Sequence, residues 1–167
     1  MNESRQVAQR ETDALVLVKN HVPWAIAAAA LPLPGIDFAA LVAVQLSMLN
    51  KLAVHYGLPF RKSAAKSVLL SLLGDVLGST LSGGLVSLAK MVPLVGSVVG
   101  VVALPTMAGA VTYAVGKVFV SHFEAGGTLL DLDPEALRNH FRQEFEPSLD
   151  NGRVIVGEKA TAKKESA

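Results

Sequence analysis

One stretch of the chain, Met91–Gly116, contains no charged residue and is bounded by Lys90 and Lys117. A helix needs about 20 predominantly apolar residues to cross a bilayer, and this stretch is long enough. The preceding stretch, Ser67–Ala89, also qualifies and contains a single charge, Asp75. The two stretches predict a membrane-spanning helical hairpin that turns near Lys90. Pro93 belongs to that turn, and Pro105 is expected to kink or split the second helix.

Composition supports a lipid-facing or oligomeric protein. Hydrophobic residues make up 51% of the 167 residues and charged residues only 17%, whereas soluble domains contain about 25% charged residues. A chain with so little polar surface must face lipid over part of its exterior or be buried in an oligomer. The net charge of +1 gives no electrostatic argument for nucleic acid. Cysteine is absent, which excludes disulfides and thiolate sites, and the polar N-terminus does not resemble a cleavable signal peptide.

An earlier helical hairpin is predicted over residues 14–56. Pro32, Pro34 and Gly35 break its backbone, and Asp37 is placed to cap the helix that follows, about Phe38–Tyr56. That helix is amphipathic, and Gly57 and Pro59 end it. Its predicted polar face carries Ser47, Asn50, Lys51 and His55, and its apolar face carries Leu41, Gln45, Met48, Leu49 and Leu52.

This first hairpin contains Lys19, His21, Asp37 and Lys51 and is therefore poor as two full spans. We expect it to be re-entrant or interfacial, with Trp24 anchored at the level of the headgroups. Gln45 is expected to satisfy carbonyls that the proline break leaves free, since a buried amide needs partners.

The fold class predicted is an all-α helical membrane protein of two successive hairpins followed by a short C-terminal amphipathic helix. Residues 1–13 extend the first helix, and residues 14–125 form the embedded domain, with hairpins 14–56 and 67–120. A cytoplasmic amphipathic helix covers 131–146, with Asp133 as its N-cap, Pro134 at its first position and one apolar stripe of Leu137, Phe141 and Phe145. Residues 150–167 are polar and predict a disordered tail.

The distribution of basic residues predicts the topology. Of the 15 lysines and arginines, only Lys90 lies in the turn between the two predicted spans. The positive-inside rule then places both termini in the cytoplasm of a bacterium and the Lys90 turn on the far side of the inner membrane.

Several short motifs resemble a known family when taken in their order. They are Leu31-Pro32-Leu33-Pro34-Gly35-Ile36-Asp37, Val44-Gln45-Leu46-Ser47-Met48, His55-Tyr56-Gly57, Lys90-Met91-Val92-Pro93-Leu94-Val95-Gly96 and Thr112-Tyr113-Ala114-Val115-Gly116. Over about residues 22–125 the chain resembles the YcjF-like family of bacterial membrane proteins of unknown function.

The resemblance implies a separate small GTPase as a partner, because such domains are often fused to or encoded beside Era-like GTPases, and some belong to membrane-stress regulons. It implies no catalytic activity. The chain has no phosphate-binding loop of its own. Gly116-Lys117-Val118 has the wrong spacing from Gly109, and valine stands where Ser or Thr would bind magnesium.

Small residues on one face of the predicted spans indicate close helix packing. They are Ser67, Ser71, Gly74, Gly78 and Ser82, with Gly96 and Gly100 as a second pair. This face fits packing of the two spans within one chain or a homo-oligomer interface. Asp75 is costly in a bilayer and should face a partner or water. It fits either a proton or ion site paired with Lys66 or Lys90, or a buried polar pair that holds the bundle together.

No residues predict catalytic, cofactor or metal chemistry, since the four histidines lack ligand spacing and no G-x-S-x-G motif occurs. The leading hypothesis is a non-enzymatic inner-membrane protein that serves as anchor, scaffold or effector for a cytoplasmic partner such as a small GTPase. An oligomeric pore or permeability factor using Asp75 is an alternative. A soluble or self-assembling helical scaffold is another.

Overall fold

The computed structural model describes residues 2–30, 36–83 and 96–165, and side chains over 3–30, 38–74, 105–133 and 135–151. In these residues the secondary structure is entirely helical. The helices are α1 (Asn2–Ala29), α2 (Ile36–His55), α3 (Lys62–Gly83), α5 (Gly96–Glu124) and α6 (Pro134–Glu165). The predicted all-α class is therefore confirmed for the described part of the chain.

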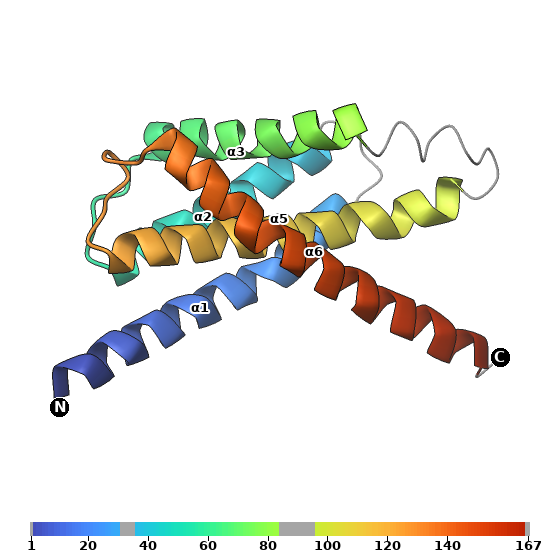
Figure 1. Cartoon of the computed structure of the whole chain (residues 1–167), viewed down its shortest axis with the longest axis horizontal. Coiled ribbons are helices and arrows are strands. Elements are labelled where there is room, and N and C mark those ends of the chain that lie inside the picture. Colours follow the sequence, from blue (N-terminus) through green and yellow to red (C-terminus); the bar gives the residue numbers. More distant parts are fainter. Residues whose placement is uncertain (1, 31–35, 84–95, 166–167) are drawn as a thin grey trace.

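Four helices, α1, α2, α3 and α5, run alternately in opposite directions (Figure 1). The end of α1, the start of α2, the end of α3 and the start of α5 consequently lie at one end of the molecule. The centre of the packing is α5, which contacts α1, α2 and α6, while α3 packs against α2 and α6. The helix α6 crosses the others obliquely (Figure 1).

The C-terminus of α2 follows directly from its sequence. Gly57 adopts a positive φ of 67°, which a residue with a Cβ rarely does. Its amide donates to the Val54 carbonyl (3.0 Å), and the Leu58 amide donates to the Ala53 carbonyl (2.8 Å). This pair of bonds is a Schellman motif, which satisfies carbonyls that the end of a helix leaves free. The predicted stop at Gly57 is confirmed.

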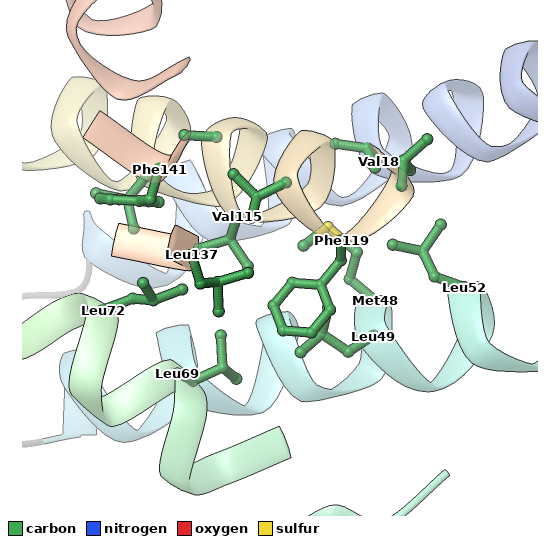
Figure 2. Packing of buried hydrophobic residues seen from close by; sticks show 14 of the residues in the cluster. Val18, Met48, Leu49, Leu52, Leu69, Leu72, Val115, Phe119, Leu137 and Phe141 are labelled. Carbon is green, nitrogen blue, oxygen red and sulfur yellow. The ribbon is translucent and has the colours of Figure 1, made fainter. Parts of the chain in front are cut away.

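The core is a layer of aliphatic and aromatic side chains where α5 meets its neighbours. Phe119 and Val115 of α5 lie against Met48, Leu49 and Leu52 of α2 on one side of the core (Figure 2). Leu137 and Phe141 of α6 and Leu69 and Leu72 of α3 complete it. The predicted apolar faces of α2 and α6 are confirmed. Gln45, Met48, Leu49 and Leu52 are fully buried, Leu137, Phe141 and Phe145 are buried, and Ser47, Asn50 and Lys51 are exposed.

One helix, α6, runs farther than the sequence predicted, and two others continue through a proline. The helix α1 continues through Pro23, and α5 continues through Pro105 without splitting. A proline removes one backbone donor, and the surrounding turns hold the helix together across that loss. The helix α6 passes Pro147 and reaches Glu165, where a disordered tail had been expected from residue 150. Its last residues are rich in Lys, Glu and Ala, which favour helix.

Among the described residues, one stretch is long and apolar enough to cross a membrane, Phe38–His55 of α2, with a mean hydropathy of 1.4 and 33% of it buried inside the bundle. This helix belongs to the hairpin that the sequence predicted to be re-entrant or interfacial. The predicted spans Ser67–Ala89 and Met91–Gly116 extend over residues 84–89 and 91–95, outside the described residues, and stay predictions.

Candidate functional site

A cluster of polar side chains joins three helices at the end of the molecule opposite the α1–α2 and α3–α5 connections. Arg10 of α1 donates to both carboxylate oxygens of Glu124 at the end of α5, from Nη2 (2.9 Å) and Nε (3.2 Å). Tyr56, which follows α2, donates its hydroxyl to Glu124 Oε1 (2.8 Å), and the Arg10 guanidinium lies 5.2 Å from the centre of the Tyr56 ring. His55 Nε2 is 2.9 Å from the Arg10 carbonyl oxygen. Glu124 is thus the common acceptor for α1 and the end of α2.

The electrostatics of this cluster are those of a fixed ion pair. The Arg10 hydrogen bond holds the pKa of Glu124 below its ordinary value of 4.5. Burial, followed by the hydrogen bond to Glu124, raises the pKa of Tyr56 well above its ordinary value of 10.0. Glu124 therefore stays ionised and Tyr56 stays protonated at neutral pH. Glu124 thus serves as an ionised acceptor that fastens α1 and the end of α2 to the end of α5.

A second set of contacts attaches α6 to α5. Lys117 Nζ lies 2.8 Å from Glu144 Oε2 of α6, and this hydrogen bond raises the pKa of Lys117. The connection between the helices is organised by Asp131, whose Oδ1 accepts from the Thr128 amide (2.6 Å) and hydroxyl (3.0 Å). Asp133 Oδ1 accepts from the Glu135 amide (2.9 Å), which confirms the predicted N-cap.

Gln45 is the buried polar residue that the sequence singled out. Its Nε2 lies 3.3 Å from Thr112 Oγ1 of α5, and its Oε1 is buried without a hydrogen-bond partner in the described part of the chain. The sequence had predicted carbonyls at the Pro32–Pro34 break as its partner, and that break lies outside the described residues. The observed partner instead ties α2 to α5, because the apolar face of α2 rests on that helix.

Close packing of helix backbones occurs between α1 and α5. A Cβ added to Gly116 would lie 2.4 Å from Val18 Cγ1, and one added to Gly109 would lie 3.0 Å from Ile26 Cγ1. The predicted small-residue face of α3 is different, since Ser67 and Gly74 are exposed and a Cβ at Gly74 would meet nothing within 4 Å. The third described member, Ser71, is partly buried and accepts a hydrogen bond from Arg138 of α6, so this face is covered in part by α6 and open at Ser67 and Gly74. The homo-oligomer interface stays a prediction.

The remaining predicted site residues lie where less is described. Pro34, Gly35, Lys90 and Pro93 are outside the described residues. The other positions lie on α2, α3 or α5, and only their backbone is described. They are Asp37, Asp75, Gly78, Ser82, Gly96 and Gly100. Within the described residues no group of three His, Asp or Glu side chains could hold a metal ion.

Sequence reasoning missed the Arg10–Tyr56–Glu124 cluster. Arg10 and Glu124 are 114 positions apart, and nothing local to either residue indicates the other. The signal that could have found them was the antiparallel order of the helices, which brings the start of α1, the end of α2 and the end of α5 together. Tyr56 and Gly57 had been noted only as a motif at the end of a helix.

The opposite end of the molecule is apolar. We define the apolar end as residues 20–29 of α1, 36–50 of α2, 67–83 of α3 and 96–116 of α5. Its only charged residues are Asp37 and Asp75. Four large hydrophobic side chains are exposed among its described residues, Trp24 (68%), Ile26 (38%), Phe38 (42%) and Leu70 (42%). We define the charged end as residues 3–13, 51–66 and 117–135, which hold the Arg10–Tyr56–Glu124 cluster and the exposed Arg61, Lys62 and Lys66.

Comparison with known proteins gives two matches. The family model described as Domain of unknown function (DUF697) matches residues 2–146. The chain is 42% identical over 159 residues to Magnetosome membrane protein 22 of Magnetospirillum gryphiswaldense, which covers 95% of this chain and 79% of that protein. No solved structure matches the chain.

Proposed function

The chain belongs to the DUF697 family, and we propose that it is a non-enzymatic bacterial membrane protein that inserts its apolar end and presents its charged end to a cytoplasmic partner. The observation that carries this proposal is the separation of charge along the bundle. All four helix ends at one end of the molecule belong to nearly uncharged segments, and the exposed Trp24, Ile26 and Phe38 lie there. A relative at 42% identity is a magnetosome membrane protein by name, which supports a membrane location.

The lengths of the apolar segments support different depths of insertion. Residues 96–116 of α5 extend for about 30 Å and residues 20–29 of α1 for about 15 Å, at roughly 1.5 Å per residue. A hydrocarbon core is about 30 Å thick, so α5 is long enough to cross it and α1 is not. By length, α5 is favoured as a span and α1 as a helix that enters only part of the way, while the Phe38–His55 stretch of α2 is also long and apolar enough to cross. By the positive-inside rule, the basic residues favour a cytoplasmic location for the charged end and both termini, with the apolar end in the inner membrane of a bacterium.

Packing inside the bundle suits a lipid environment. Helices in lipid associate through close backbone contacts at small residues and through hydrogen bonds between helices. Gly109 and Gly116 provide such contacts between α1 and α5, and Gln45 and Thr112 provide a buried hydrogen bond between α2 and α5. These contacts would hold α1, α2 and α5 together where hydrophobic burial cannot.

Membrane extraction tests the location. Membranes that contain the full-length chain are washed with alkaline carbonate and then with detergent. We expect the protein to stay in the carbonate pellet and to be released by detergent. Trp24→Glu should shift a measurable fraction to the carbonate supernatant, whereas Val54→Glu should not, because Val54 is equally exposed (69%) but lies in the charged end. Complete release of the wild type by carbonate would favour a soluble or self-assembling scaffold.

The partner is proposed from the family resemblance in the sequence, which points to a separate Era-like small GTPase. The charged end offers exposed basic residues at the start of α3, Arg61, Lys62 and Lys66. Purified GTPases of this class from the same organism, loaded with GDP or a GTP analogue, would be tested for binding to the detergent-solubilised chain. We expect binding in one nucleotide state, weakened by Arg61→Glu with Lys62→Glu and unchanged by Trp24→Glu. Absence of binding in both states would remove the GTPase as the partner.

A further inference from the structure

A pocket of 170 Å³ lies between the first half of α3, the connection before α6 and the first turn of α6. Its walls are Val68, Leu72, Leu132 and Leu137, with the hydroxyl-bearing residues Ser67 and Ser71. A dry cavity of about 150 Å³ lined by aliphatic side chains can hold a benzene molecule. The pocket can therefore hold a short run of hydrocarbon, and none of the residues that line it is charged.

The polar group beside this pocket is the guanidinium of Arg138. Its Nη2 donates to Ser71 Oγ (2.8 Å), and Ser71 lines the pocket. The Nε of the same guanidinium is buried and has no hydrogen-bond partner among the described residues, and no described carboxylate forms an ion pair with Arg138. Leaving a buried donor of a charged group unpaired is costly, so an anion placed here would gain both a hydrogen bond and charge neutralisation.

The surface on the two sides of the pocket differs in polarity. On the side of the charged end, α3 carries the exposed Lys62 and Lys66, and on the side of the apolar end it carries the exposed Leu70 and Gly74. Two acids flank Leu132, but Asp131 is engaged by Thr128 and Asp133 caps α6. Among the α3 residues whose side chains are described, the exposed charges next to the pocket are therefore positive, and Leu70 and Gly74 continue that surface without charge as far as Asp75, whose side chain lies outside the described ones.

From the apolar pocket, the unpaired Arg138 Nε and this polarity, we infer that the α3–α6 pocket binds an anionic amphiphile, a hydrocarbon chain that ends in a phosphate or carboxylate. The anionic group accepts from Arg138, with Lys66 nearby. The first carbons of the chain occupy the pocket between Val68, Leu72, Leu132 and Leu137, and the rest leaves over Leu70 toward the apolar end. Fatty acids and anionic phospholipids share this chemistry. The inference rests on the proposed membrane location, since only there is such a ligand abundant.

Photo-crosslinking of the detergent-solubilised full-length chain tests the site. The probes are a diazirine-bearing C16 fatty acid, a diazirine-bearing phosphatidylglycerol and, as the neutral control, the matching phosphatidylcholine. We expect the anionic probes to label peptides that contain residues 67–72 and 132–137. Arg138→Gln should reduce this labelling about tenfold or more, because a charge-assisted hydrogen bond is lost. Lys19→Gln, which removes an exposed charge on α1, a helix that does not line the pocket, should leave it unchanged.

Two further variants make the result decisive. Leu137→Trp should abolish labelling by filling the pocket, and Arg138→Lys should keep part of it by keeping the charge. Equal labelling by the neutral probe, labelling spread over other peptides, or full labelling of Arg138→Gln would each overturn the proposal. Labelling by the fatty acid alone identifies a free fatty acid as the ligand, and labelling by both anionic probes identifies the shared anionic chain.

The carbonate wash separates this proposal from the proposed function. Arg138→Gln should remain in the carbonate pellet while it loses pocket labelling. A wild-type chain that resists carbonate but is not labelled at the pocket would keep the membrane location and remove the lipid site. A wild-type chain that is labelled in detergent but released by carbonate would keep the lipid site and remove the membrane location.

Discussion

At Gly116 a side chain of α1 packs directly onto the backbone of α5. Val18 of α1 presses against it, and three of its carbon atoms lie within 3.0 Å of the position that a Cβ at Gly116 would occupy. Val18 is β-branched and has essentially one side-chain rotamer in a helix, so it cannot turn aside. A larger residue at position 116 must therefore move one helix away from the other.

Gly116→Ala is expected to lower the free energy of unfolding by about 1–3 kcal/mol, the usual cost of overpacking. Chemical denaturation in a mild detergent measures it. Gly74→Ala is the matched control, because a Cβ there meets nothing, and it should be neutral or stabilising by up to about 1 kcal/mol. Adding Val18→Ala to Gly116→Ala should recover part of the loss. Equal stability of the two glycine variants would contradict the close approach.

Glu124 makes the free energy of unfolding depend on pH in the acidic range. Because its pKa is lowered in the folded protein, the ion pair with Arg10 stabilises the fold above the ordinary value of 4.5, and this contribution disappears as the pH falls below it. Glu124→Gln should cost about 1–2 kcal/mol at pH 7 through loss of the charged acceptor for Tyr56. The difference in stability between wild type and variant should shrink as the pH is lowered from 5 toward 3. A constant difference would mean that Glu124 does not bear its charge in this role.

At the scale of single residues, the sequence predicted the features that depend only on neighbouring residues in the same helix. Gly57 as a helix stop, Asp133 as a cap and the buried position of Gln45 follow from residue type and helical spacing, and the structure confirms them. The partners of Gln45, Glu124 and Arg138 could not be predicted, because each lies on another helix and its identity depends on how the helices pack.

Among the elements, α6 departs most from expectation. Its start and its apolar stripe were predicted, since a cap and a spacing of four residues are local features. Its length was not, because the polar residues beyond 150 look like a solvated tail and Pro147 looks like a stop. The cap at Asp133 and the contacts of the first turns with α5 define where this helix begins.

Asp133→Ala should destabilise the first turns of α6 by about 1 kcal/mol, because two amides of that turn lose their acceptor. Amide hydrogen exchange of residues 134–141 should become faster, while α1 and α2 keep their protection. Asp133→Asn should behave like the wild type, since asparagine caps a helix equally well. Unchanged exchange in the alanine variant would show that packing of Leu137 and Phe141 alone holds this turn.

For the whole molecule, the antiparallel order of α1, α2, α3 and α5 converts a pattern along the sequence into an apolar end and a charged end. The sequence indicated uncharged stretches one at a time. It could not show that residues 20–29, 36–50 and 96–116 belong to the same end, since this depends on how the two hairpins pack together.

The absence of cysteine makes the orientation directly measurable. Trp24→Cys and Val54→Cys introduce single thiols at positions of nearly equal exposure, 68% and 69%, in the apolar end and the charged end respectively. In inverted membrane vesicles, a membrane-impermeant maleimide should react with Cys at position 54 and reach position 24 only after detergent is added. Equal reactivity of both thiols in intact vesicles would contradict insertion of the apolar end.

One helix, α5, belongs to both ends and carries contacts at several levels along its length. Thr112 meets Gln45, Lys117 meets Glu144, and Glu124 meets Arg10 and Tyr56, all at 2.8–3.3 Å. A slide of α5 by one residue, about 1.5 Å, would lengthen or reorient each of these contacts, because their partners belong to or follow three other helices, α1, α2 and α6. A displacement of the apolar end of α5 should therefore alter the contacts at its charged end, and with them the positions of α1, α2 and α6.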